Sequence, residues 1–387
     1  MTPTPAQPLL LFGAPVGLYT GKVRSYLRKH GIAYSERLPS DPIFQKQLLP
    51  KLKRFINPVI QMPDGTVVQD TADILDYLEA QGLARHASTP ATPRQRMMAL
   101  IVDLYGGDGL IRPAMHYRWH YRRENEAFLR HEFGLSYRPG RAAPEVVEQQ
   151  LTNFMNYLNG HLPNLGITSE TGPLIESRYE ELLATLDAHF RAHPYALGGQ
   201  PTIADYGLMA PLYAHLARDP VPATLMKRLA PSLYRWTERM NAPDNDAPEF
   251  PRTPYALPAD DAIPDTLLPL LKQIAVDFLP ELEATVRALD EWWTQHGNEG
   301  LVGQPAERGL VRMRFSWRGT SVTTVLAPYL IYKLQKVTDA WTALDDTGRA
   351  AVAPLLDAAG LTPLVTLKPL RRIERRDFLE VWGPATA

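Results

Sequence analysis

The chain has 387 residues, of which 45% are hydrophobic and 21% are charged, and its 41 basic and 42 acidic side chains leave a formal net charge of -1. This balance gives no basic surface for nucleic acid or an anionic membrane, so we expect neither as a partner. The absence of cysteine excludes a disulfide framework, a cysteine nucleophile and a thiolate metal site. Without a signal-peptide pattern or an apolar run of ~20 residues, we expect a cytoplasmic protein of about two or three domains.

The chain begins with the pattern of a βαβ unit. Residues 9–12 (Leu-Leu-Leu-Phe) form an apolar run typical of a central strand, and apolar residues recur at helical spacing over 23–27 before Gly31 ends the helix. Residues 32–36 predict a second strand parallel to the first, joined to it by a right-handed crossover.

Two further strands and a helix are predicted after this unit. Pro58 begins a strand, Pro63-Asp64-Gly65 is a turn, and a second strand follows near Val67. Asp70-Thr71 then opens a helix, because an acid and a hydroxyl at a helix start can accept hydrogen bonds from its free backbone N–H groups.

Helical spacing dominates the middle of the chain. A linker at 87–93 precedes apolar residues at helical spacing from 97 to about 240, and Thr202-Ile203-Ala204-Asp205 is a capping box that starts one helix. The segment 112–172 is longer and more polar than a minimal helical domain requires, so we interpret it as an insertion. Proline and acid density over 241–251 marks a boundary.

The last part of the chain predicts a mixture of helix and strand. Residues 264–293 read as one long amphipathic helix, 310–315 as a half-buried strand and 325–344 as another helix. A terminal segment, 371–382, is expected to pair with the strand at 310–315.

The chain resembles the glutathione transferase superfamily in two stretches. They are Asn57-Pro58-Val59-Ile60 through Leu78, and Gly198 through Leu208. The resemblance implies a thioredoxin-like α/β domain over 6–84 and an all-α domain over 92–245, with the insertion at about 112–172. The α+β extension over 255–387 lies outside the resemblance. The resemblance also implies a homodimeric detoxification enzyme that uses glutathione as co-substrate, although the insertion or the extension could cover the usual interface.

The resemblance assigns glutathione to the first domain. It implies that Pro58 is a cis proline, that the backbone of Val59 pairs with the cysteinyl part of glutathione, and that Asp70 and Thr71 hold the γ-glutamyl carboxylate at a helix N-terminus. The family usually has Glu-Ser or Gln-Ser here, so Asp70 has a shorter reach. Capping of the helix by the same two residues is compatible with this role. The implied glutathione-binding residues are Gly17, Lys22, Asn57, Pro58, Val59, Asp70 and Thr71.

The residue that activates the glutathione thiol does not follow the family pattern. The positions that carry a Tyr, Ser or Cys in the family are Phe12-Gly13 and Gly17 here, and none of them has a side-chain donor. Tyr19 and Thr20 are the only hydroxyls of the loop and are the candidate catalytic residues, with the backbone at 21–22 as a fallback. An equally good interpretation is that both residues are structural: Tyr19 packs in the core, and Thr20 caps the helix.

Early residues of the helical domain supply a candidate pocket for the apolar electrophile. His116 and His120, with Glu124 one turn further, share a helical face, but the Glu of a zinc-protease motif is missing between them, so we interpret the pair as a polar face and expect no metal. The predicted pocket residues are Tyr105, Arg112, His116, Tyr117, Trp119 and His120.

Three functions agree with these features. The first is an enzyme that binds glutathione and directs its thiolate at an apolar electrophile. The second is a non-catalytic module that binds glutathione, a hydrophobic ligand or another protein, and the missing hydroxyl favours it. The third is a glutathione-dependent disulfide reductase, which needs no protein cysteine.

Overall fold

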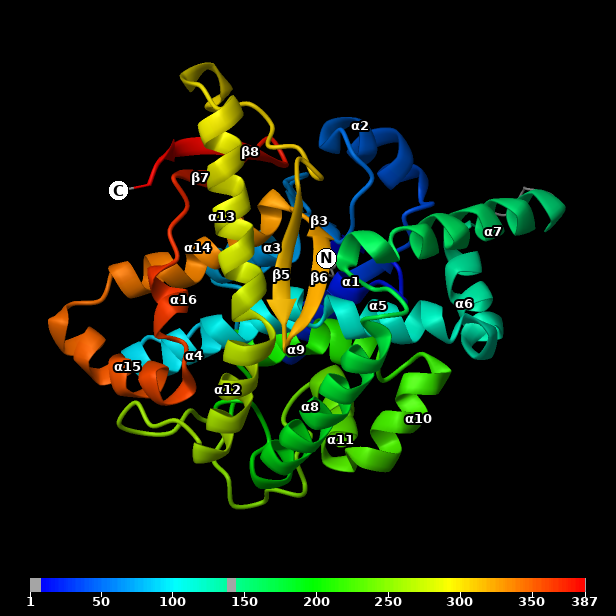
Figure 1. Cartoon of the computed structure of the whole chain (residues 1–387). Coiled ribbons are helices and arrows are strands. Elements are labelled where there is room, and N and C mark those ends of the chain that lie inside the picture. The colour runs from blue at the N-terminus through cyan, green and yellow to red at the C-terminus, as the bar shows by residue number, and fades with distance from the viewer. Residues whose placement is uncertain (1–7, 138–143, 387) are drawn as a thin grey trace.

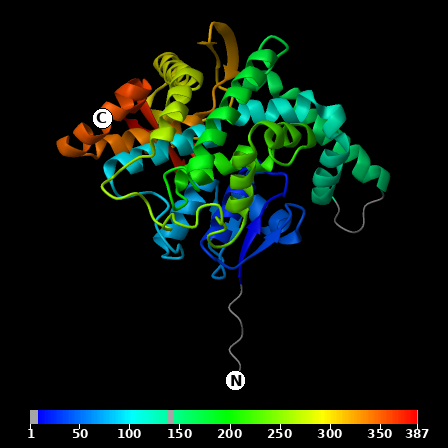
Figure 2. The same ribbon diagram turned by 90° about the horizontal axis from the view of Figure 1, so that it is seen from below.

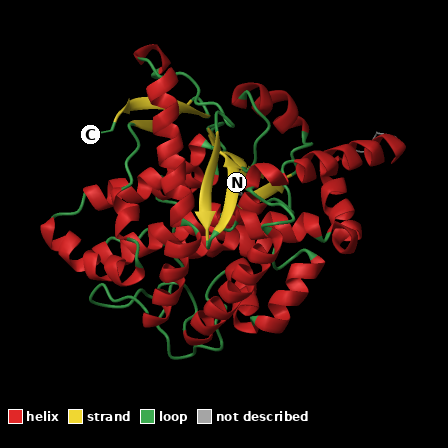
Figure 3. Ribbon diagram, in the orientation of Figure 1, coloured by secondary structure: helices red, strands yellow, loops and turns green. Residues whose placement is uncertain are grey.

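The computed structural model describes residues 8–137 and 144–386 of the chain. Helices dominate this part of the chain, and its strands form three small sheets (Figure 3). Among the described residues, no helix combines the length and the apolar character needed to cross a membrane.

The N-terminal domain is built on a four-stranded sheet with the order β2-β1-β3-β4, in which β1 and β2 are parallel and the other pairs antiparallel. Since successive side chains of a strand point to opposite faces, Leu11 and Ile60 enter the main core, whereas Phe12 and Val59 join a second cluster with Phe44. The predicted thioredoxin-like α/β class is confirmed. The elements are β1 (Leu9–Phe12), α1 (Leu18–Lys29), β2 (Tyr34–Arg37), α2 (Leu49–Leu52), β3 (Val59–Gln61), β4 (Val67–Gln69) and α3 (Thr71–Ala80).

A helical region follows, as predicted. The Thr202–Asp205 capping box is present: the backbone N–H of Thr202 donates to Asp205 Oδ2 at 2.9 Å. In both views α6 and α7, which lie in the predicted insertion, project from the rest of the molecule (Figures 1 and 2). The helices are α4 (Pro93–Leu104), α5 (Ile111–His120), α6 (Arg122–Tyr137), α7 (Pro144–Gly160), α8 (Gly172–Ala192), α9 (Ile203–Ala214), α10 (Pro220–Leu229) and α11 (Pro231–Asn241).

The remainder of the chain has the α+β character predicted for it. Its helices pack on the helical region, so one hydrophobic core runs from the N-terminal domain into this extension. Its elements are α12 (Leu268–Asp277), α13 (Leu279–His296), β5 (Arg312–Trp317), β6 (Thr320–Val325), α14 (Pro328–Thr342), α15 (Asp346–Ala359), α16 (Thr362–Thr366), β7 (Arg371–Arg376) and β8 (Leu379–Ala385).

The prediction of one long helix over 264–293 is wrong. The chain forms α12 and α13 instead, with a break at Phe278, and Pro280 lies in the first turn of α13. Proline has no N–H to donate, and its ring clashes with the carbonyl four residues earlier, so Pro280 disfavours a continuous helix here and suits the first turn of α13. Apolar periodicity does not reveal this break.

The predicted pairing of residues 371–382 with the strand at 310–315 is also wrong. Each segment forms its own hairpin: β5 pairs with β6, and β7 pairs with β8. The two-residue turns, Arg318-Gly319 and Asp377-Phe378, have positive φ at both positions, as type I′ turns require. The predicted helix over 325–344 therefore begins later, at Pro328, because Val325 is the last residue of β6.

A buried ion cluster joins the three parts of the chain. Asp103 on α4 accepts a hydrogen bond from Lys22 Nζ of α1 at 2.5 Å and from Lys333 Nζ of α14 at 2.8 Å. All three side chains are at most 5% exposed. The N-terminal domain thus binds Oδ1 of Asp103 through Lys22, and the extension binds Oδ2 of the same carboxylate through Lys333.

A π-helical turn, Tyr105–Gly109, follows α4 at its closest approach to α9. A Cβ atom added to Gly106 would lie 2.5 Å from the backbone of Gly207, whereas one added to Gly107 would meet nothing within 4 Å. A Cβ atom added to Gly207 would likewise lie 2.5 Å from Asp103 Cα, so this close approach requires that neither residue 106 nor residue 207 has a side chain.

Replacement of Gly106 or Gly107 by alanine tests this crossing. Gly106→Ala should lower the free energy of unfolding by roughly 1–3 kcal/mol, because the methyl group pushes α4 from α9. Gly107→Ala, in the same turn, should leave it nearly unchanged. Chemical denaturation of both variants measures the difference, and equal losses would contradict the close crossing.

Candidate functional site

A cavity of about 490 Å³ lies where the three parts of the chain meet. We call it the first cavity. Five of the residues predicted for glutathione or its thiol line it: Tyr19, Asn57, Pro58, Asp70 and Thr71. The opposite walls come from the helical region, with Asp108 and Arg112, and from the extension, with Tyr329 and Leu330 among others.

The wall from the N-terminal domain is formed by two loops. The Asn57–Pro58 bond is cis, and β3 begins at the next residue, Val59, which pairs with Phe12 and Gln69. Asp70 caps α3, since its Oδ1 accepts a hydrogen bond from the N–H of Ala72 at 3.0 Å. The cis proline expected from the resemblance is therefore present beside the start of α3.

Asp70 has an unusual backbone conformation. Its φ of 81° lies in the region that favours glycine, and such a conformation costs roughly 1–3 kcal/mol when another residue adopts it. Strained residues of this kind gather at ligand sites, where the surrounding structure holds them in place. In this conformation Asp70 lines the cavity, and α3 begins at the next residue.

The extension contacts the same carboxylate. The hydroxyl of Tyr329 donates to Asp70 Oδ1 at 2.8 Å, and Arg375 Nη2 lies 3.6 Å from Asp70 Oδ2. In the first turn of α3, Asp73 accepts a hydrogen bond from the hydroxyl of Tyr332 at 2.6 Å. The extension is thus a wall of the cavity and balances the charge of Asp70, which the sequence did not indicate.

Asp108 is a cavity residue that the sequence analysis missed. It lies in the π-helical turn after α4, and no described residue hydrogen-bonds its carboxylate. Burial, assisted by Asp103 and Asp70 and opposed by Lys333, raises the pKa of Asp108 to about 7. The Gly-Gly-Asp-Gly run at 106–109 was the available signal, because glycines interrupt a helix and π-helical turns are frequent at functional sites.

Of the two candidate catalytic hydroxyls, only that of Tyr19 reaches the cavity. Its hydroxyl donates to the carbonyl of Gly107 at 3.1 Å, and burial, together with Asp108 and Asp70, raises its pKa well above the usual value. Tyr19 therefore stays protonated and acts as a donor. Thr20 is fully buried, lines neither large cavity, and its Oγ1 has no hydrogen-bond partner among the described residues.

Three other residues predicted for glutathione lie outside the first cavity. The side chain of Lys22 is buried against Asp103, so it cannot reach a ligand there. Gly17 lines a second cavity, described next, and Val59 faces the cluster around Phe44. The backbone of Val59 already pairs with Phe12 and Gln69 within the sheet, so it is not free for the predicted pairing with glutathione.

A second cavity, of about 540 Å³, adjoins the first and shares Phe55 and Asn57 with it. Its walls are largely apolar, and part of them comes from α6 and α7 of the insertion. The apolar lining residues include Val16, Leu18, Met115, Trp119, Phe133 and Leu158.

The structure does not gather the six residues of the predicted acceptor pocket, and this prediction needs correction. Arg112 lines the first cavity and pairs with Glu281 at 2.9 Å, whereas Trp119 lines the second. The other four lie elsewhere: Tyr105 belongs to the π-helical turn after α4, and the other three lie on faces of α5 that line neither cavity. Tyr105 packs on Phe278, Tyr117 packs between Tyr121 and Tyr179, and His116 and His120 face Glu176 of α8.

Comparisons with known proteins fit this architecture. Residues 11–84 match the family model of the glutathione S-transferase N-terminal domain, and residues 144–239 match that of the C-terminal domain. A search of curated proteins finds no match.

Solved structures of similar fold include three bacterial proteins. A glutathione S-transferase from Rhodospirillum rubrum F11 is 15% identical, with a TM-score of 0.39, over 67% of this chain and 99% of its own. A β-etherase from Sphingobium sp. strain SYK-6 is 18% identical, with a TM-score of 0.44, over 62% of this chain and 97% of its own. A glutathione S-transferase from Methylobacterium radiotolerans JCM 2831, in complex with glutathione sulfonate, is 20% identical, with a TM-score of 0.36, over 67% of this chain and 100% of its own. These values carry no conclusion about substrate.

The raised pKa of Asp108 predicts a pH-dependent stability. The folded chain holds this proton up to about pH 7, whereas the unfolded chain loses it near pH ~4, so the wild type loses stability as the pH rises between these values. Asp108→Asn removes this loss. The difference in free energy of unfolding, Asp108→Asn minus wild type, should therefore increase by roughly 1–3 kcal/mol between pH 5 and pH 8. Chemical denaturation at both pH values measures it, and a difference independent of pH would contradict the raised pKa.

Proposed function

Since the chain belongs to the glutathione S-transferase superfamily, we propose that its first cavity binds glutathione and that the chain transfers it to an apolar electrophile held in the second cavity. One observation carries this proposal. One wall of the first cavity is formed by Asn57, the cis Pro58, Asp70 and Thr71. The titratable carboxyl of Asp108 lines the same cavity from the opposite side.

The start of α3 suits the γ-glutamyl end of glutathione. An α-carboxylate there would accept hydrogen bonds from the free N–H groups of the first turn, where the helix dipole favours an anion. No described residue hydrogen-bonds the hydroxyl of Thr71, so it is available to the same carboxylate. The adjacent ammonium group would lie against Asp70, and the cysteinyl part would lie beside the cis Pro58.

The thiol would then lie between Tyr19 and Asp108. Asp108, with a pKa of about 7, suits a general base at neutral pH. Tyr19 would donate to the sulfur by giving up its hydrogen bond to the carbonyl of Gly107, since its hydroxyl has one proton. The S–H bond breaks, its proton passes to the Asp108 carboxylate, and the sulfur lone pair attacks the electrophilic carbon, whose leaving group departs with its bonding electrons. Because Asp108 becomes neutral in this step, the developing thiolate is not held beside a second anion.

The second cavity suits the electrophile. Its apolar lining would bind an aromatic or aliphatic acceptor by removing it from water. Phe55 and Asn57, which border both cavities, mark the place where sulfur and acceptor carbon would meet. The insertion would set acceptor selectivity, since α6 and α7 supply Phe133 and Leu158.

The homodimer and the cytoplasmic location stay predictions. Tyr329 and Tyr332 of α14 contact α3, and Lys333 contacts α4, so the extension covers part of both helices. A homodimer would therefore have to use other surfaces, and light scattering of the purified chain decides its oligomeric state.

Glutathione binding is tested at α3. Asp70→Ala should weaken binding at least ten-fold, because the ammonium group loses its carboxylate partner. Asp76→Ala removes an exposed acid of the same helix, paired with Lys336, and should bind like wild type. Calorimetric titration measures both, with circular dichroism to verify folding. Unchanged binding by Asp70→Ala would remove this assignment.

The non-catalytic alternative is favoured by one observation, the lack of a hydroxyl at Gly17 together with the burial of Thr20. Conjugation of glutathione to 1-chloro-2,4-dinitrobenzene distinguishes it. In the proposed mechanism the rate rises through about pH 7, as Asp108 ionises, and Asp108→Asn lowers it roughly 100-fold while glutathione affinity is kept. Binding without any rate above the uncatalysed reaction would support the non-catalytic alternative.

A further inference from the structure

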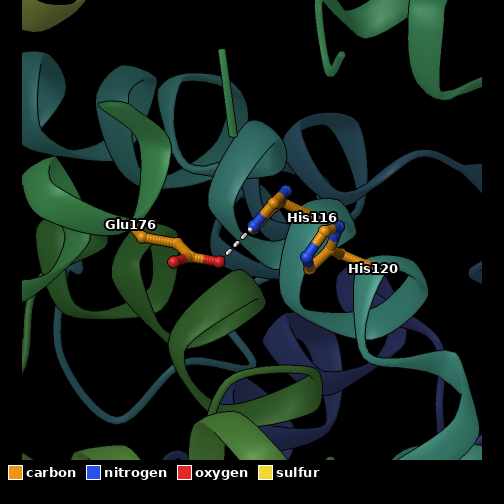
Figure 4. Close-up of side chains that lie close together, drawn as sticks. All are labelled: His116, His120 and Glu176. Atoms are coloured by element: carbon orange, nitrogen blue, oxygen red, sulfur yellow. Dashed lines mark hydrogen bonds and ion pairs between the residues drawn. The ribbon is translucent and has the colours of Figure 1, made fainter. Parts of the chain in front are cut away.

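Two histidines and a glutamate from different helices face one another away from the lining of the two large cavities. His116 and His120 lie four residues apart on α5, and Glu176 lies in the early part of α8 (Figure 4). His116 Nε2 is 2.9 Å from Glu176 Oε1, and the two imidazole rings stack with their centroids 4.8 Å apart. One potential ligand atom from each residue lies within 4.8 Å of the others.

We propose that His116, His120 and Glu176 bind a divalent transition-metal ion, with zinc as the best chemical match. Two imidazole nitrogens and one carboxylate oxygen are a common zinc donor set, and a fourth position stays open to solvent. Tetrahedral zinc with bonds of ~2.0–2.2 Å holds its ligand atoms ~3.4 Å apart. The exposed His120 and the half-buried Glu176 can close the remaining distance by side-chain rotation.

The protonation states suit a cation. Burial lowers the pKa of His116, so its ring is neutral at pH 7. Nε2 would bind the ion in the tautomer that carries its proton on Nδ1, and the ion would replace the hydrogen bond between Nε2 and Glu176. Burial alone would raise the pKa of Glu176, but hydrogen bonds from His116 and Tyr121 outweigh it and lower the pKa, so the carboxylate is ionised. Tyr121 also orients that carboxylate, because its hydroxyl donates to Oε1 at 2.8 Å.

A hydrogen bond between His116 and Glu176 accounts for only part of this arrangement. It leaves His120 stacked on His116 without a hydrogen bond to any described residue. A metal ion gives that ring a partner and joins α5 to α8. Because His116 Nδ1 has no hydrogen-bond partner among the described residues, the site lacks an outer support that commonly raises affinity ~10–100-fold. We therefore expect micromolar, exchangeable binding.

Calorimetric titration of the chelator-treated full chain with zinc chloride at pH 7.5 tests the proposal. Wild type should bind one ion per chain, and its melting temperature should rise with zinc concentration. His120→Ala, at an exposed position where folding is not at risk, should weaken binding at least ten-fold. His131→Ala, at an exposed histidine of α6, should bind like wild type and controls for adventitious imidazole binding.

Cobalt absorption adds a readout of geometry. With wild type, Co²⁺ should give the intense visible bands of a four-coordinate ion, and these bands should be lost in His120→Ala and in Glu176→Gln. No saturable zinc binding by wild type, or equal zinc affinity in wild type and His120→Ala, would overturn the proposal.

Discussion

The buried carboxylate of Asp103, held between Lys22 and Lys333, is the interaction on which the arrangement of the chain depends. Burial alone would raise the pKa of Asp103, but the two ammonium groups hold it well below its ordinary range. Removal of one partner from a buried pair typically costs about 3–5 kcal/mol, because the remaining charge is left without compensation. Since the three side chains come from α4, α1 and α14, the N-terminal domain and the extension take fixed positions against the same helix. The first cavity is the space that this geometry leaves between them.

This constraint makes the extension part of the candidate site. α14 delivers Lys333 to Asp103 and, from the preceding turn, Tyr329 to Asp70. The cavity wall at α3 therefore carries a carboxylate that is already hydrogen-bonded before any ligand arrives. In the proposed function, a ligand ammonium group would share Asp70 with the Tyr329 hydroxyl, which holds the carboxylate in one orientation and would restrict the poses of the ligand. The extension thus bears on selectivity as well as on packing.

The sequence predicted those parts of the fold that depend on local chemistry. Pro58 and the Thr202–Asp205 capping box are recognisable because each acts on backbone groups a few residues away. The hairpins of the extension were missed because partner choice between strands depends on the whole fold, although Arg318-Gly319 was a turn signal. The third residue facing His116 was sought at Glu124, one helical turn away, whereas the structure supplies Glu176 from another helix, 60 residues along the chain. Asp108 was missed for a similar reason, since only folding brings its turn to the wall opposite Pro58.

The missing hydroxyl at the start of α1 has a steric cause. A Cβ atom at Gly17 would lie 2.9 Å from Thr20 Oγ1 and 3.0 Å from the carbonyl oxygen of Ala14, so a serine does not fit unless the loop shifts. Thr20 fills that space from the first turn of α1, and Gly17 in turn leaves room at the wall of the second cavity. The loop after β1 therefore contributes shape to the site, and the nearest side-chain donor is Tyr19, in the first turn of α1. The titratable carboxyl of the first cavity comes instead from Asp108, in a turn that lies against α9 because Gly106 and Gly207 have no side chains.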